Sequence, residues 1–155
     1  MKKLIIVLDN IRSTFNVGSI FRTADATGCT EIYLCGITPT PENPKMPKTS
    51  LGSEKTVSWK YYNNTIEALK NLQNKNIPIY AVELTKESQN FQKITYFNKK
   101  NSEIALVFGH EKNGISEPVL DYCDKKVYIP MKGQKESLNV AITASILMFE
   151  ALRYN

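Results

Sequence analysis

The sequence predicts one α/β domain over residues 1–155, in which helices flank a mostly parallel sheet. Five apolar, β-branched runs are continuous rather than alternating, as in strands that are covered on both faces. Segments of helical periodicity fall between them, which is typical of β-α-β units. With 42% hydrophobic and 23% charged residues, the chain is long enough to bury the core of one such domain.

The predicted strands are short and bounded by polar residues. In chain order they are Leu4–Leu8, Glu31–Cys35, Ile79–Leu84, Ile104–Phe108 and Val127–Ile129. Between the second and the third, the segment Ile37–Ser53 holds four prolines, which predict a long loop without regular structure. Loops of this length in a compact domain are commonly functional or disordered.

Four helices are predicted, over residues 16–28, 64–74, 116–123 and 138–153. Asn16 is placed to cap the first, Gly28 to end it, and Asn64 opens the second as part of a capping box with Glu67. The last helix is apolar on nearly all sides. We therefore expect it to pack against the sheet and also against a partner subunit.

Charge and cysteine content exclude several classes of protein. The net charge is +5 and the isoelectric point about 9.0, which only mildly favours polyanionic partners over a soluble, Lys-rich surface. Three cysteines without Cys-x-x-Cys spacing and a single histidine, His110, argue against disulfides and against a metal site. The first apolar run is too short for a signal peptide and no stretch approaches a membrane span, so we expect a cytoplasmic protein without membrane contact.

Three polar loops follow predicted strands, at residues 10–16, 109–114 and 129–139. In open α/β sheets, ligands bind beyond the carboxyl ends of the strands, so the three loops predict one site. In the first loop's helix, Arg22 lies about 240° around from Asn16 and shares a face with Asp25. Arg22 is either a surface residue that pairs with Asp25 or a residue that is needed for function. Only three arginines occur against seventeen lysines, which hints that the planar guanidinium is needed where an arginine is kept.

The second and third loops carry different chemistry. Gly109 allows a ligand to approach the backbone closely, and Glu111 can accept hydrogen bonds, although a plain strand-to-helix turn is the alternative. Neither Gly-x-Gly-x-x-Gly nor a Walker loop is present. In the third loop, Ile129, Met131 and Leu138 are suited to form a flat apolar slot for an adenine ring. Ser137 is placed as an N-cap, and Asn139 is an unusual residue for a buried helix start without a partner.

Together, the loops resemble the three motifs of the SpoU/TrmH family of ribose 2'-O-methyltransferases, in the SPOUT superfamily, over nearly the whole chain. The matching positions are Asn16, Gly18, Arg22 and Gly28 in motif one; Gly109, Glu111 and Gly114 in motif two; and Ile129, Pro130, Met131, Ser137, Leu138 and Asn139 in motif three.

The resemblance implies an enzyme that uses S-adenosyl-L-methionine to methylate a ribose 2'-hydroxyl of tRNA or rRNA. It also implies a C-terminal trefoil knot, a homodimer with sites near the subunit interface, and no required metal. The implied catalytic residues are Arg22, Asn16, Glu111, Ser137 and Asn139. The implied cofactor-binding residues are Val82, Glu83, Gly109, Ile129, Met131, Ser137 and Leu138. For contact with RNA, the candidates are Arg12, Lys45, Lys48 and Lys55.

Two alternatives remain open from the sequence. One is a catalytically inactive RNA-binding relative of the same fold, although such a protein has no chemical need for all five implied catalytic residues. The other is an unrelated α/β nucleotide-binding protein, which the missing phosphate-loop glycines disfavour.

Overall fold

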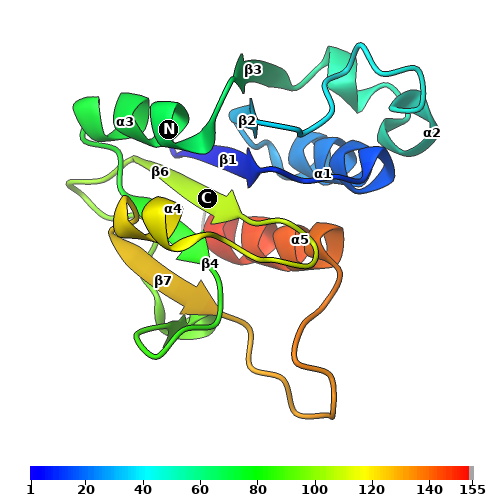
Figure 1. The fold of residues 1–155 in the computed structure, drawn as a ribbon. Helices are drawn as coiled ribbons and strands as arrows, with labels where there is room; N and C mark the ends of the chain where they lie inside the picture. The colour runs from blue at the N-terminus through cyan, green and yellow to red at the C-terminus, as the bar shows by residue number, and fades with distance from the viewer. Residues whose placement is uncertain (154–155) are drawn as a thin grey trace.

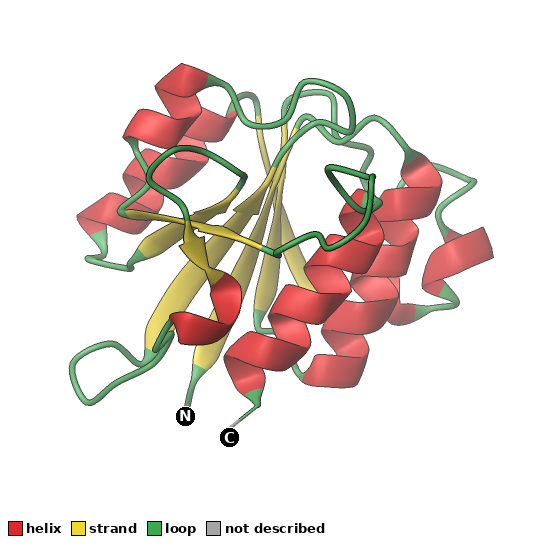
Figure 2. Ribbon diagram, turned by 90° about the horizontal axis from the view of Figure 1, so that it is seen from below, coloured by secondary structure: helices red, strands yellow, loops and turns green. Residues whose placement is uncertain are grey.

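The computed structural model describes residues 1–153, which form a seven-stranded sheet with helices on both faces (Figures 1 and 2). The strands are β1 Lys3–Asp9, β2 Glu31–Cys35, β3 Ser58–Tyr62, β4 Ile79–Val82, β5 Gln89–Asn90, β6 Glu103–Phe108 and β7 Lys125–Tyr128. The helices are α1 Thr14–Thr27, α2 Pro47–Ser50, α3 Thr65–Asn74, α4 Glu117–Asp121 and α5 Val140–Leu152, with short 3-10 turns η1 Ser53–Lys55 and η2 Phe91–Lys93.

The strands are paired in the order β3-β2-β1-β6-β4-β7-β5, and all six pairs are parallel. Strand β6 is inserted between β1 and β4, and Leu8 of β1 lies opposite Phe108 of β6. The loops that follow β1 and β6 therefore leave the sheet side by side at one edge. This order brings two of the three predicted motif loops together.

Burial on both faces explains why the strands read as continuous apolar runs. In β1, Leu4, Ile6 and Leu8 face a core shared with α1 and α5, while Ile5 and Val7 face the core under α3 and α4. Figure 2 shows the helices on the two sides of the sheet. The predicted mostly parallel sheet flanked by helices is confirmed. Among residues 1–153, no helix is long and apolar enough to cross a bilayer.

Two strands were not predicted, because neither has the pattern of a doubly covered strand. Strand β3 lies at one edge of the sheet and contains no buried residue, and Ser58 and Lys60 keep its sequence from forming an apolar run. Strand β5 at the other edge has only two residues. The predicted strand Ile79–Leu84 ends earlier, at Val82, and the predicted strand Val127–Ile129 instead extends over Lys125–Tyr128.

The helix boundaries confirm some predicted caps and correct others. Gly28 ends α1 in the left-handed region with φ of 73°, and Asn64 Oδ1 accepts the N–H of Glu67 at 3.0 Å, both as predicted. The prediction that Asn16 caps α1 is wrong. Ser13 is the cap and accepts the N–H of Asn16 at 3.2 Å, which frees the Asn16 side chain for other contacts.

The long segment Ile37–Ser53 is not devoid of regular structure, because it contains α2. Pro47 is tolerated at the start of this helix, where its missing N–H would have no partner. Helix α2 packs tightly on α1. A Cβ on Gly18 would lie 2.0 Å from Thr49 Oγ1, and that hydroxyl donates to the carbonyl oxygen of Phe15 at 3.0 Å.

Candidate active site

Glu111 connects the loop after β6 to the start of α1. Its carboxylate accepts the backbone N–H groups of Arg12 and Ser13, both at 3.0 Å, and the side-chain amide of Asn16 at 3.3 Å. Burial raises the pKa of Glu111, but the hydrogen bonds from Arg12, Ser13 and Asn16 outweigh this effect, so the pKa lies below its ordinary value. The carboxylate is therefore ionised at neutral pH, beside the positive end of a helix.

Asn139 connects the third motif to the first. It is the N-cap of α5, and its Oδ1 accepts the N–H groups of Ala141 at 2.9 Å and Ile142 at 3.3 Å. Its Nδ2 donates to Asn16 Oδ1 at 3.1 Å. The cap was predicted at Ser137, which is wrong. The Asn139 side chain thus caps a helix with its oxygen and donates to a neighbouring element with its nitrogen.

Three predicted catalytic residues therefore form one chain of hydrogen bonds, Glu111 to Asn16 to Asn139. Ser137 does not join it. Ser137 is exposed and its side chain makes no hydrogen bond to any of residues 1–153.

The loop after β6 is closed on itself, which changes the interpretation of Gly109. A Cβ at this position would lie 2.4 Å from the carbonyl carbon of Gly114, so the missing side chain makes room for the loop itself. The loop is tightened further by His110 Nδ1, which accepts the N–H groups of Lys112 at 3.1 Å and Asn113 at 3.2 Å. The backbone of this loop is thus held in one shape before any ligand binds.

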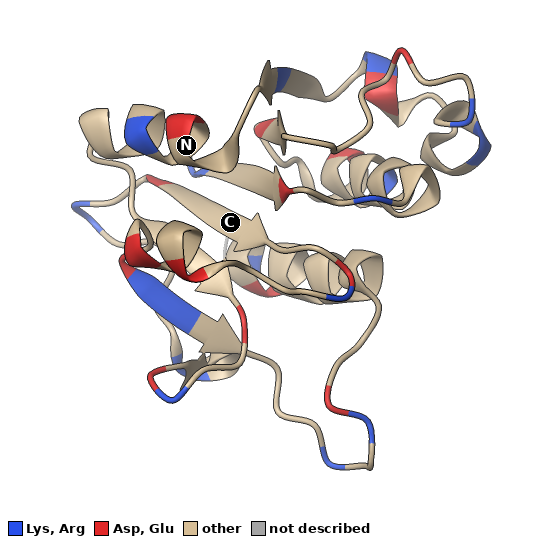
Figure 3. Ribbon diagram, viewed as in Figure 1, with Lys and Arg blue, Asp and Glu red and all other residues tan. Residues whose placement is uncertain are grey.

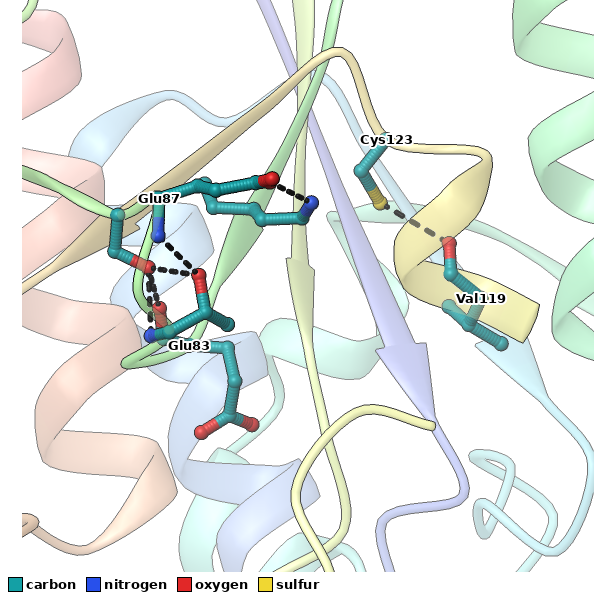
Figure 4. A network of polar contacts seen from close by, with 7 residues as sticks. Glu83, Glu87, Val119 and Cys123 are labelled. Carbon is teal, nitrogen blue, oxygen red and sulfur yellow. Dashed lines mark hydrogen bonds and ion pairs between the residues drawn. The ribbon is translucent and has the colours of Figure 1, made fainter. Parts of the chain in front are cut away.

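Glu83 was predicted as a cofactor-binding residue. Its carboxylate contacts the end of the loop after β6. Glu83 Oε2 accepts the N–H of Ile115 at 2.9 Å, and Gly114 packs directly on this carboxylate. The carbonyl oxygen of Glu83 accepts from Ser88 Oγ at 2.6 Å (Figure 4). Figure 4 shows the Glu83 side chain extending away from that turn. Val82, the last residue of β4, precedes it and is partly buried.

The third motif leaves the body of the domain between β7 and α5, as the orange segment of Figure 1 shows. Residues 132–139 are exposed, Leu138 by 40%, while Ile129 and Met131 are half-buried. The flat apolar slot for an adenine ring stays a prediction. Two hollows of the described chain lie elsewhere, one of about 190 Å³ beside Glu87 and Lys126 and one of about 640 Å³ along α5.

Arg22 is exposed on α1 and forms no ion pair or hydrogen bond with any of residues 1–153. The alternative that Arg22 pairs with Asp25 is wrong, since the Asp25 carboxylate accepts from Thr56 Oγ1 at 2.6 Å. Arg22 also lies outside the chain of hydrogen bonds around Asn16. Its guanidinium is therefore free to contact a ligand.

The four residues predicted to contact RNA are exposed and lie near the first motif. Arg12 precedes α1, and its backbone N–H is held by Glu111. Lys45, Lys48 and Lys55 lie on or beside α2 and η1, where Figure 3 shows blue segments. Because α2 packs on α1, these cations border the exposed side of α1. Within residues 1–153, no group of three His, Cys, Asp or Glu side chains could hold a metal ion.

One buried residue of this region was not singled out from the sequence. Asp9 ends β1, is 3% exposed, and accepts hydrogen bonds from Thr65 Oγ1 and from Asn10 Nδ2. Burial raises its pKa above the ordinary value, although the bonds from Thr65 and Asn10 oppose this effect. Asn10 in turn accepts the N–H of Ile37 at 3.0 Å. A charged residue directly after the apolar run Leu4–Leu8, followed by Asn, was the available signal.

Known proteins resemble this chain in sequence and in fold. The SpoU rRNA Methylase family matches residues 3–149. A tRNA (guanosine(18)-2'-O)-methyltransferase of Thermus thermophilus is 34% identical over 150 residues, which are 97% of this chain and 74% of that protein. A 23S rRNA (guanosine-2'-O-)-methyltransferase of Xylella fastidiosa is 31% identical over 150 residues, 97% of this chain and 58% of that protein.

A solved structure agrees with these relatives. The AdoMet-bound rRNA methyltransferase from Sinorhizobium meliloti superimposes with a TM-score of 0.89 at 29% identity, over 98% of this chain and 56% of that one. This chain thus spans somewhat more than half the length of the Xylella and Sinorhizobium proteins.

The fold and the three joined motifs define an RNA 2'-O-methyltransferase of the S-adenosylmethionine-dependent class. The chain belongs to the SpoU rRNA methylase family. The resemblance seen in the sequence is therefore confirmed, and the alternative of an unrelated α/β nucleotide-binding protein is wrong.

Proposed function

We propose that this chain transfers the methyl group of S-adenosylmethionine to a ribose 2'-hydroxyl of tRNA or rRNA. The observation that carries the proposal is the chain of hydrogen bonds from Glu111 through Asn16 to Asn139, which joins the three motif loops at one edge of the sheet. The relatives support it, because their names describe 2'-O-methylation of guanosines in tRNA and in 23S rRNA.

The residues around the third motif fit the cofactor. Ile129, Met131 and Leu138 offer apolar surface for an adenine ring, and the exposure of Leu138 at 40% leaves that surface uncovered. The preformed loop from Gly109 to Gly114 offers backbone groups beside it. When bound, S-adenosylmethionine supplies a methyl carbon that is activated by a positively charged sulfur. Glu83 and Val82 support this site from the end of β4.

Arg22 is the proposed catalytic residue. A guanidinium stays protonated in proteins, so Arg22 stabilises the developing negative charge on the 2'-oxygen instead of removing its proton. With S-adenosylmethionine bound, the methyl carbon would leave the sulfur, which keeps the bonding electron pair, and join the 2'-oxygen, while the hydroxyl proton would pass to solvent. Asn16, which Glu111 and Asn139 hold in place, orients the ribose at the start of the same helix. Positioning of oxygen, carbon and sulfur in line supplies much of the rate.

A homodimer is part of the proposal. Ile142, Ile146 and Phe149 follow one another at i, i+4 and i+7 on α5, and Ile142 and Phe149 are 53% and 59% exposed. This stripe borders the hollow of about 640 Å³, which Phe91 and Arg153 also line. An apolar stripe of this kind is suited to a second copy. Phe149→Glu is expected to give monomers in sedimentation velocity, whereas Lys70→Glu on α3 is expected to leave the dimer intact.

The C-terminal trefoil knot and the cytoplasmic location are also proposed. The match to the SpoU rRNA methylase family supports the knot, which the resemblance implies. The proposed tRNA or rRNA substrate supports the cytoplasmic location. The RNA is expected to lie beside the exposed lysines on and next to α2, Lys45, Lys48 and Lys55.

The proposal is tested by calorimetry with S-adenosylmethionine and by mass mapping of 2'-O-methyl nucleotides in RNA from a strain that lacks this protein. We expect cofactor binding, and one or more methylated nucleotides missing from the map. Arg22→Ala should abolish transfer while cofactor binding survives, and Lys70→Ala, on the other face of the sheet, should change neither. An unchanged map together with absent cofactor binding would favour an inactive RNA-binding relative.

A further inference from the structure

The exposed face of α1 carries two large side chains, Phe15, which has no role in the proposed reaction, and Arg22, the proposed catalytic residue. They lie seven residues apart, so both fall on one face of the helix, about 10 Å apart along its axis. Ser19, four residues after Phe15, lies between them on the same face. Phe15 is 49% exposed although its carbonyl oxygen is held by Thr49. The ring is thus presented to solvent from a fixed backbone.

Neighbouring elements enclose this face of α1 on both sides. On one side, Thr23 Oγ1 is 2.8 Å from Ser145 Oγ of α5. On the other side, Asp25 bonds to Thr56, next to η1, and α2 packs against Gly18. The ring and the guanidinium therefore lie along one shallow surface between α5 and the segment that contains α2 and η1. We call the residues Phe15, Ser19 and Arg22 the exposed face of α1.

The side of this face formed by α2 and η1 carries three exposed lysines, Lys45, Lys48 and Lys55. Of the carboxylates nearby, Glu42 is exposed, while Asp25 and Glu54 accept hydrogen bonds from hydroxyl groups. Asp25 accepts from Thr56, and the buried Glu54 accepts from Ser50. The lysine ammonium groups beside the ring are therefore available to contact phosphate groups.

We propose that Phe15 is a nucleobase-stacking residue that holds a base next to the nucleotide whose ribose is methylated. An exposed aromatic ring bordered by cations is the combination with which proteins bind unpaired nucleotides, because the ring stacks on a base while the cations bind phosphates. With Arg22 at the reacting ribose, the ring on the same face reaches a neighbouring nucleotide. The inference rests on the proposed function, and it assigns a specificity residue that contacts base rather than ribose.

The first test compares Phe15→Ala, Phe15→Leu and Phe15→Tyr in methyl transfer to RNA from a strain that lacks the protein. Loss of one stacked base should raise the KM for RNA about tenfold in the Ala and Leu variants, with little change in kcat, while Tyr keeps the wild-type KM. Tyr61→Ala, which removes an aromatic ring of similar exposure (47%) from edge strand β3, is the matched control and should leave the KM unchanged.

A second readout does not depend on catalysis. In Phe15→Trp, the new indole should be quenched on addition of the same RNA, whereas the wild-type protein, whose only tryptophan is Trp59, should show little change. A wild-type KM in Phe15→Leu would overturn the proposal, because the flat ring would then be unnecessary. Conversion of Phe15→Ala to a monomer would overturn it as well, because a second copy would then cover the ring.

The two readouts also separate the proposals. Quenching of the indole without any methyl transfer by the wild-type protein would count against the proposed function alone. Methyl transfer with no quenching and an unchanged KM would count against the role of Phe15 alone.

Discussion

The side-chain amide of Asn139 donates to Oδ1 of Asn16 across 3.1 Å, joining the starts of α5 and α1. The two residues are 123 positions apart in the sequence. The bond is possible because α5 packs alongside α1 on one face of the sheet, with Thr23 of α1 beside Ser145 of α5. Asn139 acts in two ways at once, as a helix cap and as a donor to the first motif.

These two roles can be separated by substitution. Asn139→Ala should lower the free energy of unfolding by about 1 kcal/mol, because α5 loses its cap, and should also lower the rate of methyl transfer. Asn139→Ser should restore most of the stability, since Ser caps helices well, but not the rate, since it has no amide to donate to Asn16. Chemical denaturation and single-turnover transfer measure the two effects.

The matched control for this series is Asn64→Ala, which removes the cap of α3 on the other face of the sheet. It should cost a similar free energy, about 1 kcal/mol, without changing the rate. If Asn139→Ser transferred methyl groups as fast as the wild type, the contact with Asn16 would have no part in the site.

The pH dependence of stability should reveal the contacts of Glu111. Its folded-state pKa is lowered from 4.5 because the hydrogen bonds to Arg12, Ser13 and Asn16 outweigh the effect of burial. A lowered carboxyl pKa stabilises the folded state at pH values above the unfolded-state pKa, and this contribution is lost as the pH falls through the lower folded-state value. The wild type should therefore exceed Glu111→Gln in stability by a constant amount above about pH 5.5.

Below pH 4.5, that difference should shrink steadily. The exposed Glu42 has no hydrogen-bond partner within the described chain, so Glu42→Gln should track the wild type at every pH. Thermal melts between pH 3 and pH 7 make the comparison, and parallel curves for wild type and Glu111→Gln would contradict it.

The closed loop after β6 should not tolerate a methyl group at Gly109. An added Cβ would lie 2.4 Å from the carbonyl carbon of Gly114, which is backbone and cannot rotate away. Gly109→Ala should therefore cost about 1–3 kcal/mol of stability, as in other overpacked sites, and should weaken binding of S-adenosylmethionine. Gly133→Ala is the control, since a Cβ there meets no atom within 4 Å. Equal melting temperatures for the two variants would contradict the prediction.

Lys45 and Lys48 should contribute to RNA affinity by neutralising phosphates. Replacing both with Ala should weaken RNA binding at low salt and reduce the slope of log affinity against log salt concentration by about 0.7–0.9 for each phosphate that is no longer neutralised. Lys99→Ala with Lys100→Ala, in an exposed turn before β6, removes the same charge away from α1. Binding titrations at several salt concentrations measure the slopes, and equal slopes for the two double variants would refute a role for the α2 lysines.

Much of the sheet could be predicted because its central strands are buried on both faces. The apolar runs in β1, β2 and β6 directly reflect that burial. The edge strand β3 was missed, since none of its residues is buried and its sequence therefore lacks an apolar run. Helix α2 was missed because its prolines suggest a loop, although a proline fits the first turn of a helix.

The site could be predicted in its parts but not in its contacts. The sequence identified Glu111, Asn16 and Asn139 through their motifs, and misplaced both caps. Ser13 and Asn139 cap the helices, and only packing decides which of several nearby polar side chains is free to do so. Gly109 was read as making room for a ligand, whereas its neighbour Gly114 occupies that space.

Sequence alone determined the fold class, the family and the three motif loops, because buried strands and motif residues at characteristic spacing are local patterns. Only the tertiary structure decided that Glu111, Asn16 and Asn139 meet, and that Arg22 stands apart from them with Phe15 on the exposed face of α1. Those relationships depend on the insertion of β6 beside β1 and on the packing of α5 against α1. Contacts between residues more than a hundred positions apart leave no periodicity that one sequence can show.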